Sequence, residues 1–150
     1  MKKLVAAAGA ALALALGFVA LTGFHGGCGL HRHPRDPAQV AAFVTERVDD
    51  ALDDLDATSD QRTRIHAVKD RLLAEGQKAR AGHDEARAAM LAEWKAEQPD
   101  APRLHQLVDA RVDELRALAH QAVDAGVEVH GILTPEQREK VTRKVERWHR

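Results

Sequence analysis

Apolar residues recur every three or four positions along most of the chain, which is the repeat of one buried face of an α-helix. Four helices are predicted in this way: Pro37 to Asp56, Ser59 to about Gln98, Arg103 to Gly131, and Pro135 to about Trp148. No segment shows the strict alternation of apolar and polar residues that is typical of a strand. The pattern therefore predicts an all-α fold.

Prolines and glycines divide this pattern. Pro99-Asp100-Ala101-Pro102 predicts a turn between the second and third helices, because proline ends or begins helical runs. The two long helices should then lie side by side as a central antiparallel hairpin. Gly76 and Gly82 lie inside the second helix and should each lower its stability by ~1 kcal/mol relative to alanine.

An uncharged stretch precedes the helices. Two lysines follow Met1, and residues 4–24 contain no charge, as in an export segment whose lysines stay in the cytoplasm. Residues 1–24 are predicted to be a signal peptide or, because 21 apolar residues can span a ~30 Å hydrocarbon core, an N-terminal membrane anchor. Lipidation of Cys28 is a third alternative, disfavoured by His25 where an aliphatic residue would be expected. All three place the remainder in the periplasm.

The composition looks different once this segment is set aside. The whole chain is 45% hydrophobic and 3% aromatic, with a net charge of −1. In residues 25–150, however, 20 of the 49 hydrophobic residues are alanine, which is too little bulky material for a thick core. We expect a Gly/His-rich flexible leader over residues 25–36 and thin helical layers over residues 37–150, completed by a second copy in a homodimer.

Charge and cysteine content exclude two classes. Balanced charge argues against a nucleic-acid binder that depends on a basic surface. A single cysteine, Cys28, cannot form a disulfide within its own chain. No nucleophile motif and no glycine-rich phosphate loop is recognisable, so an enzyme is not expected and no nucleotide or other cofactor is required.

A short motif occurs twice. Ala57-Thr58-Ser59-Asp60-Gln61 begins the second predicted helix, and Leu133-Thr134-Pro135-Glu136-Gln137 begins the fourth. Each has the form of a capping box, in which the threonine accepts from the amide three residues later and the glutamine reaches back to the threonine amide. The residues expected to cap are Thr58, Gln61, Thr134 and Gln137.

Two such motifs, flanking a long hairpin behind an export segment, resemble the Spy/CpxP family of periplasmic stress proteins, whose hallmark is a repeated L-T-x-x-Q. The second copy matches fully, whereas the first has Ala57 in place of leucine. The resemblance implies a bent four-helix hairpin that dimerises into a thin cradle. It also implies one of three roles: an ATP-independent chaperone, an inhibitor of a sensor kinase, or a metal-binding sensor related to ZraP and CnrX.

From this resemblance we expect a periplasmic chaperone that binds unfolded or misfolded envelope proteins. The exported part is slightly acidic, so capture of acidic clients should be weaker than in basic members of the family. A heavy-metal-binding sensor or resistance protein of the same fold is the alternative. An inhibitory partner of a sensor kinase, or a partner of an anti-sigma factor, is a further one. The membrane is contacted only through the N-terminal segment.

Nine histidines motivate the metal alternative. Cys28, His31 and His33 bring a thiolate and two imidazoles within six residues, a donor set suited to zinc, nickel or copper. A solvated leader without a metal is the competing interpretation. Adjacent-turn His-x-x-x-His, the strongest helical metal spacing, is absent.

The other histidines are less informative. His83 lies on the apolar stripe of the second helix and should be a satisfied or partly buried side chain. Solvent exposure is expected for the remaining flank positions, which are His66, His105, His130 and His149, and His120 points away from the stripe of its own helix. Asp49, Asp50, Asp53 and Asp54 form an acidic patch that we expect to be a solvated face.

Overall fold

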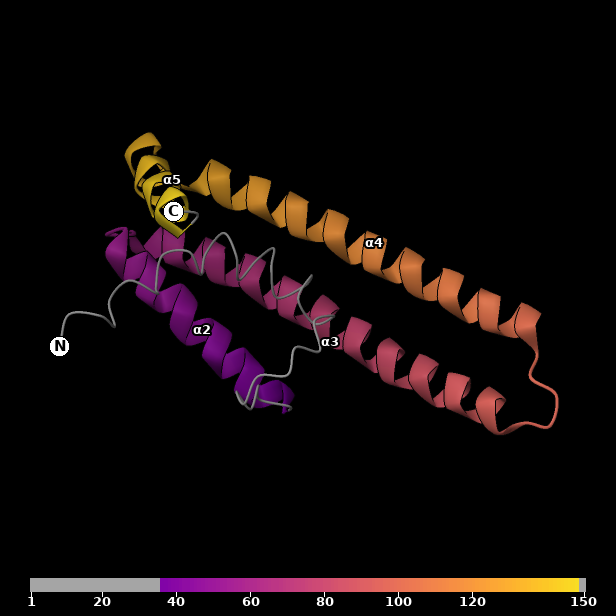
Figure 1. The fold of residues 1–150 in the computed structure, drawn as a ribbon. Coiled ribbons are helices and arrows are strands. Elements are labelled where there is room, and N and C mark those ends of the chain that lie inside the picture. The colour runs from indigo at the N-terminus through magenta and orange to yellow at the C-terminus, as the bar shows by residue number, and fades with distance from the viewer. Residues whose placement is uncertain (1–35, 149–150) are drawn as a thin grey trace.

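A computed structural model describes residues 36–148, in which four helices follow one another: α2 (Pro37–Asp54), α3 (Ser59–Lys95), α4 (Ala101–Ile132) and α5 (Pro135–Trp148). No strand occurs in this part of the chain, so the all-α prediction is confirmed. The long helices α3 and α4 lie side by side in opposite directions, α2 lies along the first half of α3, and α5 crosses the open end of the hairpin (Figure 1).

Capping residues explain where the helices begin. Asp36 accepts from the Ala38 amide at 3.0 Å, and Asp100 accepts from the Arg103 amide at 3.0 Å. The second cap corrects the predicted turn, because α4 starts at Ala101 and Pro102 lies in its first turn. Proline fits there without losing a hydrogen bond, since the first amides of a helix have no partner within it.

Two helix ends also differ from the prediction. The first helix ends at Asp54, where Asp56 adopts a left-handed conformation (φ 52°) that stops helical bonding. Aspartate tolerates this conformation better than most residues. The second helix ends at Lys95 rather than near Gln98, because Ala96 is already extended (ψ 147°). Gly76 and Gly82 do not interrupt α3.

The hydrophobic core lies at one end of the hairpin, where α2, the first turns of α3 and the last turns of α4 meet. Its fully buried side chains are Val48, Leu52, Ile65 and Val68. Between Lys69 and Glu93 no residue of α3 is buried. The outer half of the hairpin is therefore two helices thick and has no closed core of its own.

Polar contacts hold the outer end together instead. Glu93 accepts from the Asp100 amide at 3.1 Å and pairs with Arg103 at 2.9 Å, which joins the last turn of α3 to the first turn of α4. Further back, Arg111 donates to the Ala79 carbonyl and pairs with Glu114 across Gly82. In residues 36–148 no helix is long and apolar enough to cross a membrane.

Candidate functional site

The two glutamines of the repeated motif meet at the open end of the hairpin. The Gln61 amide nitrogen Nε2 donates to Oε1 of Gln137 at 2.9 Å, and Nε2 of Gln137 donates to Oε1 of Gln61 at 3.1 Å. Both side chains are buried, with 8% of each residue exposed. The motifs were identified separately from sequence, and the structure joins them in one reciprocal pair.

Each glutamine also completes its own capping box. Oε1 of Gln61 accepts from the Thr58 amide at 3.0 Å, and the Thr58 hydroxyl accepts from the Gln61 amide at 3.3 Å. The corresponding distances between Gln137 and Thr134 are 2.9 and 3.3 Å. All four predicted capping residues therefore have the predicted contacts.

The remaining amide hydrogens bond to the ends of the other two helices. Nε2 of Gln61 donates to the Ile132 carbonyl at 3.0 Å, and Nε2 of Gln137 donates to the Leu55 carbonyl at 3.1 Å. Carbonyls at the C-terminal end of a helix have no partner within it, and burial without a partner would be costly. The pair thus joins the starts of α3 and α5 to the ends of α2 and α4. We call these four linked residues, Thr58, Gln61, Thr134 and Gln137, the glutamine clamp.

The substitution in the first motif does not weaken its apolar contact. Ala57 and Leu133, which precede the two threonines, are both buried in the same core. Ile65 is fully buried, and Val141, its counterpart in α5, packs partly buried against that core. The Ala57 amide also donates to the Leu52 carbonyl at 3.0 Å, which ties the start of the motif to the last turn of α2.

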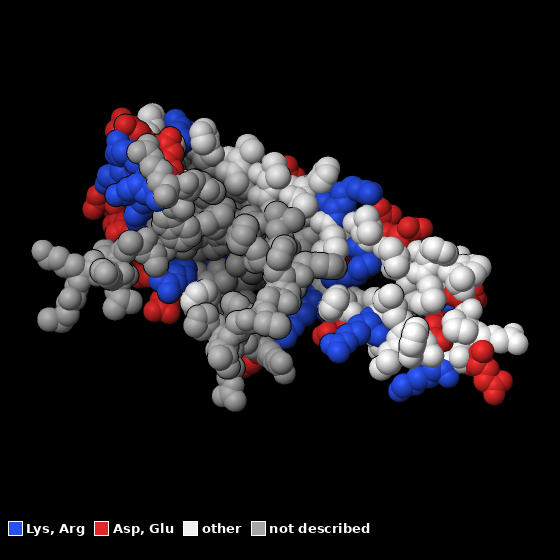
Figure 2. Space-filling model, in the orientation of Figure 1, with Lys and Arg blue, Asp and Glu red and all other residues white. Residues whose placement is uncertain are grey.

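The acidic patch next to the clamp is solvent-exposed, as expected, but its carboxylates also form ion pairs. Asp49 pairs with His66 at 2.9 Å and Asp53 pairs with Arg62 at 2.6 Å. Two lysines of α5 supply further partners, Lys140 to Asp56 at 3.0 Å and Lys144 to Asp54. Acidic and basic side chains accordingly lie next to one another at this end of the molecule (Figure 2). The exposed patch therefore pairs with basic side chains of the protein's own helices.

The structure also corrects two histidines. His66 is half-buried between α2 and α3 rather than exposed, because Asp49 lies opposite it. His83 is exposed rather than partly buried, but it has an interaction partner, as expected of a satisfied side chain. Lys69 contacts Thr45 and His66 contacts Asp49, so α2 runs antiparallel to α3 and its first residue lies opposite about residue 77. The helix α2 therefore does not extend as far as His83. His105, His120 and His130 are exposed as expected, and His149 lies outside the described residues.

Sequence reasoning missed one buried cation. Lys69 is 6% exposed and donates to the Thr45 hydroxyl at 2.9 Å while pairing with Asp70 at 3.0 Å. A single lysine on a helical face gives no signal of burial, because its long side chain usually reaches solvent. Here it fixes the register of α2 on α3.

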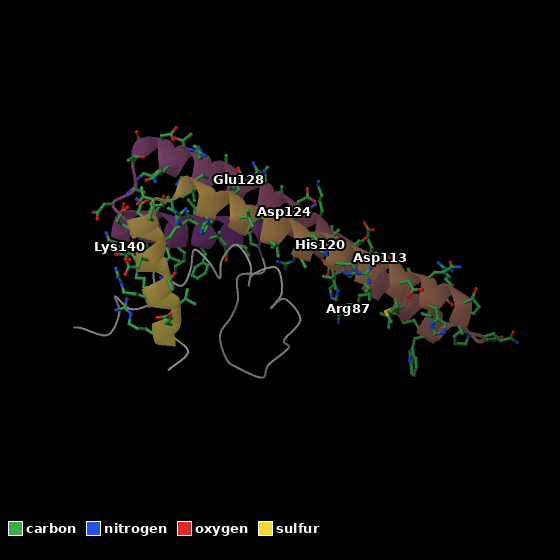
Figure 3. All side chains as sticks on the ribbon, turned by 90° about the horizontal axis from the view of Figure 1, so that it is seen from above. Arg87, Asp113, His120, Asp124, Glu128 and Lys140 are labelled. Carbon is green, nitrogen blue, oxygen red and sulfur yellow. The ribbon has the colours of Figure 1, made fainter. Side chains whose placement is uncertain are left out.

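The described helices do not form a metal site. No group of three histidine, cysteine, aspartate or glutamate side chains comes close enough within residues 36–148 to hold a metal ion. His120, Asp124 and Glu128, for example, follow one another along α4 (Figure 3). The predicted ligands Cys28, His31 and His33 lie outside the described residues.

Large apolar side chains are exposed mainly on one side of the molecule. On α3, Leu91 lies 18 residues, about five turns, beyond Leu73, which packs on the core. The side of α3 that α2 covers near the core is therefore bare further along the helix. Helical geometry places Val108 and Val112 of α4 on the same side. We call this set the apolar side, made of Met90, Leu91, Trp94, Val108 and Val112.

Comparison with known proteins gives one match. A family described as heavy-metal resistance matches residues 10–140. No curated protein and no solved structure matches the chain.

Proposed function

The chain belongs to the heavy-metal resistance family, which is part of the Spy/CpxP-like all-helical superfamily, and from this premise we propose that it binds heavy-metal ions as a resistance or sensor protein. The match carries the proposal, because it spans residues 10–140 of a 150-residue chain and therefore the whole hairpin. Of the three roles that the resemblance implied, the metal-binding one has this support, whereas the chaperone and the kinase inhibitor do not.

The proposal assigns metal capture to Cys28, His31 and His33. A cysteine and two histidines are donors that zinc, nickel and copper share, and a fourth position would be filled by water or another side chain. These residues immediately precede α2 in the sequence. Within the described helices the donors are too scattered to replace them.

The location belongs to the same proposal. Export through residues 4–24 would place the metal ligands outside the cytoplasm, where a resistance protein meets the metal first. The intact mass of the protein isolated from its host tests this directly. A mass showing that cleavage removes the N-terminal residues up to and including Cys28 would mean that the thiolate is lost, and the proposed site with it.

Growth of the host in graded zinc, nickel and copper tests the function. A strain lacking the gene should tolerate less of one of these metals, and the wild-type gene should restore tolerance. A gene encoding Cys28→Ser, His31→Ala and His33→Ala together should not restore it. A matched gene encoding His105→Ala and His120→Ala, two exposed helical histidines, should restore it fully. Equal tolerance with and without the gene, for all three metals, would refute the proposal.

A second candidate, ATP-independent binding of unfolded proteins, is favoured by the apolar side. Trp94 is 84% exposed and Leu91 is 51% exposed, and large apolar patches on soluble proteins mark interaction surfaces. The protein should then suppress aggregation of an unrelated unfolded protein without nucleotide. Leu91→Ser with Trp94→Ser should lose this activity, whereas Val127→Ser, an exposed valine elsewhere on α4, should keep it. Absence of suppression by the wild type at several-fold excess would end this candidate.

A further inference from the structure

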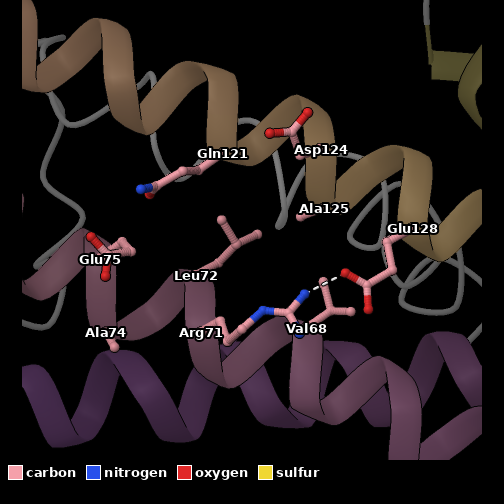
Figure 4. A pocket seen from close by; sticks show the side chains of 9 residues that line it. All are labelled: Val68, Arg71, Leu72, Ala74, Glu75, Gln121, Asp124, Ala125 and Glu128. Atoms are coloured by element: carbon pink, nitrogen blue, oxygen red, sulfur yellow. Dashed lines mark hydrogen bonds and ion pairs between the residues drawn. The ribbon is translucent and has the colours of Figure 1, made fainter.

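The side of the hairpin opposite the apolar side contains a groove between α3 and α4. Its volume is about 390 Å³, and its lining residues are Val68, Arg71, Leu72, Ala74, Glu75, Gln121, Asp124, Ala125 and Glu128. Figure 4 shows Leu72 of α3 reaching into the space, with Gln121 and Asp124 of α4 across from it.

Small residues explain why the space is open. Ala74 and Ala125 fill their positions in the lining with a single methyl group each. The floor of the groove is apolar, because Val68, Leu72 and the two alanines supply it.

The rim is polar and predominantly acidic. It contains three carboxylates, Glu75, Asp124 and Glu128, and one cation, Arg71. Arg71 pairs with Glu128 across one end of the groove, and Glu75 pairs with Lys78 at 2.6 Å. Among the described residues no ion pair or hydrogen bond engages the Asp124 carboxylate. One negative charge therefore remains uncompensated beside an apolar floor.

This combination complements a cation on an alkyl stem. The stem of an arginine or lysine side chain covers apolar surface while its charged head stays at the polar edge. Arginine fits better than lysine, because its planar guanidinium bonds a carboxylate through two parallel hydrogen bonds and has a donor left for the Gln121 side-chain oxygen. A volume near 390 Å³ is at the small end of ligand sites and suits one side chain.

We propose that this groove is a docking site for an arginine side chain carried by an extended segment of a partner protein, with Asp124 as its counter-ion and Leu72 beneath its stem. This site is separate from the proposed metal ligands and goes beyond the metal function. A single exposed ion pair is weak, so one arginine binds only loosely, and a partner presenting several gains by multivalency.

The test uses the full chain in mild detergent and a fluorescently labelled peptide, Gly-Leu-Arg-Leu-Gly repeated twice. Matched peptides carry glutamate or norleucine in place of arginine. Anisotropy should report tighter binding of the arginine peptide than of either control. Equal binding of all three peptides would show that the groove does not read charge and would overturn the proposal.

Two variants locate the binding. Asp124→Asn should weaken the arginine peptide at least threefold, and Ala74→Leu, which fills the groove from an exposed helical position, should weaken it similarly. Glu97→Gln, an exposed carboxylate near the α3–α4 turn, is the matched control and should not change it. Unchanged binding by the first two variants would overturn the assignment. Displacement of the peptide by equimolar zinc from the wild type but not from Asp124→Asn would reassign the groove to a metal ion and would also overturn it.

Discussion

At the scale of single residues, the glutamine clamp is held by many hydrogen bonds. Gln61 and Gln137 are buried, and each uses its oxygen twice and its nitrogen twice within the clamp. Buried polar groups stabilise a fold only when all of them are satisfied. Loss of one glutamine therefore leaves the other without its two reciprocal hydrogen bonds, leaves a helix-end carbonyl without its donor, and removes a helix cap.

Gln137→Ala should lower the free energy of unfolding by about 2–4 kcal/mol, from the lost cap and the unsatisfied groups left behind. Chemical denaturation measures this. The double variant with Gln61→Ala should lose less than the sum of the two single variants, because the pair is already broken. Gln77→Ala, at an exposed position of α3, is the control and should change stability by less than about 0.5 kcal/mol. Additive effects at the two glutamines would contradict the reciprocal pair.

Glu136 gives the clamp region a dependence on pH. Hydrogen bonds from its own backbone amide and from the Thr134 hydroxyl, aided by the Arg138 charge, hold the pKa of this carboxyl below its ordinary value of 4.5. A lowered pKa in the folded state stabilises the fold above pH 4.5, and this contribution is lost as the pH falls through the lowered value. Glu136→Gln should therefore lose less stability than the wild type between pH 6 and pH 3, measured by thermal unfolding. If the wild type lost no more stability than the variant between pH 6 and pH 3, this prediction would be contradicted.

The residue scale also shows what the sequence could and could not predict. The capping boxes followed from local spacing, because a cap depends on residues three apart. The contact between Gln61 and Gln137 depends on how helices 76 residues apart pack, and only the repetition of the motif hinted at it. The burial of Lys69 was missed and that of His66 was misjudged, because α2 causes both and no local pattern specifies its register on α3.

At the scale of helices, α3 is long and has two glycines with different surroundings. A Cβ atom at Gly76 would meet nothing within 4 Å, whereas one at Gly82 would lie 2.9 Å from Oε2 of Glu114 and 3.1 Å from Nη1 of Arg111. Gly82 thus leaves room for the Arg111–Glu114 pair, and Gly76 has no such contact in the described structure.

Gly76→Ala should accordingly raise the free energy of unfolding by about 1 kcal/mol, because alanine favours a helix and restricts the unfolded chain. Gly82→Ala should gain clearly less, since the ion pair must shift to admit the methyl group. Thermal denaturation of both variants under identical conditions compares them. An equal gain at both positions would show that the Arg111–Glu114 pair is not held over Gly82.

Helix boundaries were predicted to within a few residues, and the errors have physical causes. Pro102 was assigned to the turn, but the Asp100 cap lets α4 begin at Ala101 with proline in its first turn. The first helix ends at Asp54 because Asp56 adopts a left-handed backbone conformation, which the neighbouring sequence does not predict. Strong apolar repeats predict that a helix exists, whereas caps decide where it begins.

At the scale of the whole molecule, the two sides of the hairpin differ. On one face of the hairpin, α2 covers the core end and the exposed residues of the apolar side lie further along. The opposite face contains the acidic-rimmed groove. Nearer the α3–α4 turn, uncharged surface separates smaller charged groups (Figure 2). The thin fold was predicted from the scarcity of bulky apolar residues. The division into two sides required the packing of α2 to be known.

A second copy of the chain covering the apolar side remains our prediction for the assembly. Sedimentation of the full chain in detergent should then give a dimer. The double variant Leu91→Ser with Trp94→Ser should raise the dissociation constant of the dimer at least tenfold. Val127→Ser, exposed but outside the apolar side, should leave the dimer intact. A monomeric wild type at all accessible concentrations would contradict the prediction.

The central claim is that this chain binds a heavy metal through Cys28, His31 and His33, and calorimetric titration of the full chain with zinc, nickel and copper tests it most directly. We predict a Kd well below 1 mM for at least one metal, weakened tenfold or more by Cys28→Ser, His31→Ala and His33→Ala together. The control with His105, His120 and His130 all changed to alanine should bind like the wild type. A Kd no tighter than ~1 mM for all three metals, or undiminished binding by the first variant, would contradict the account.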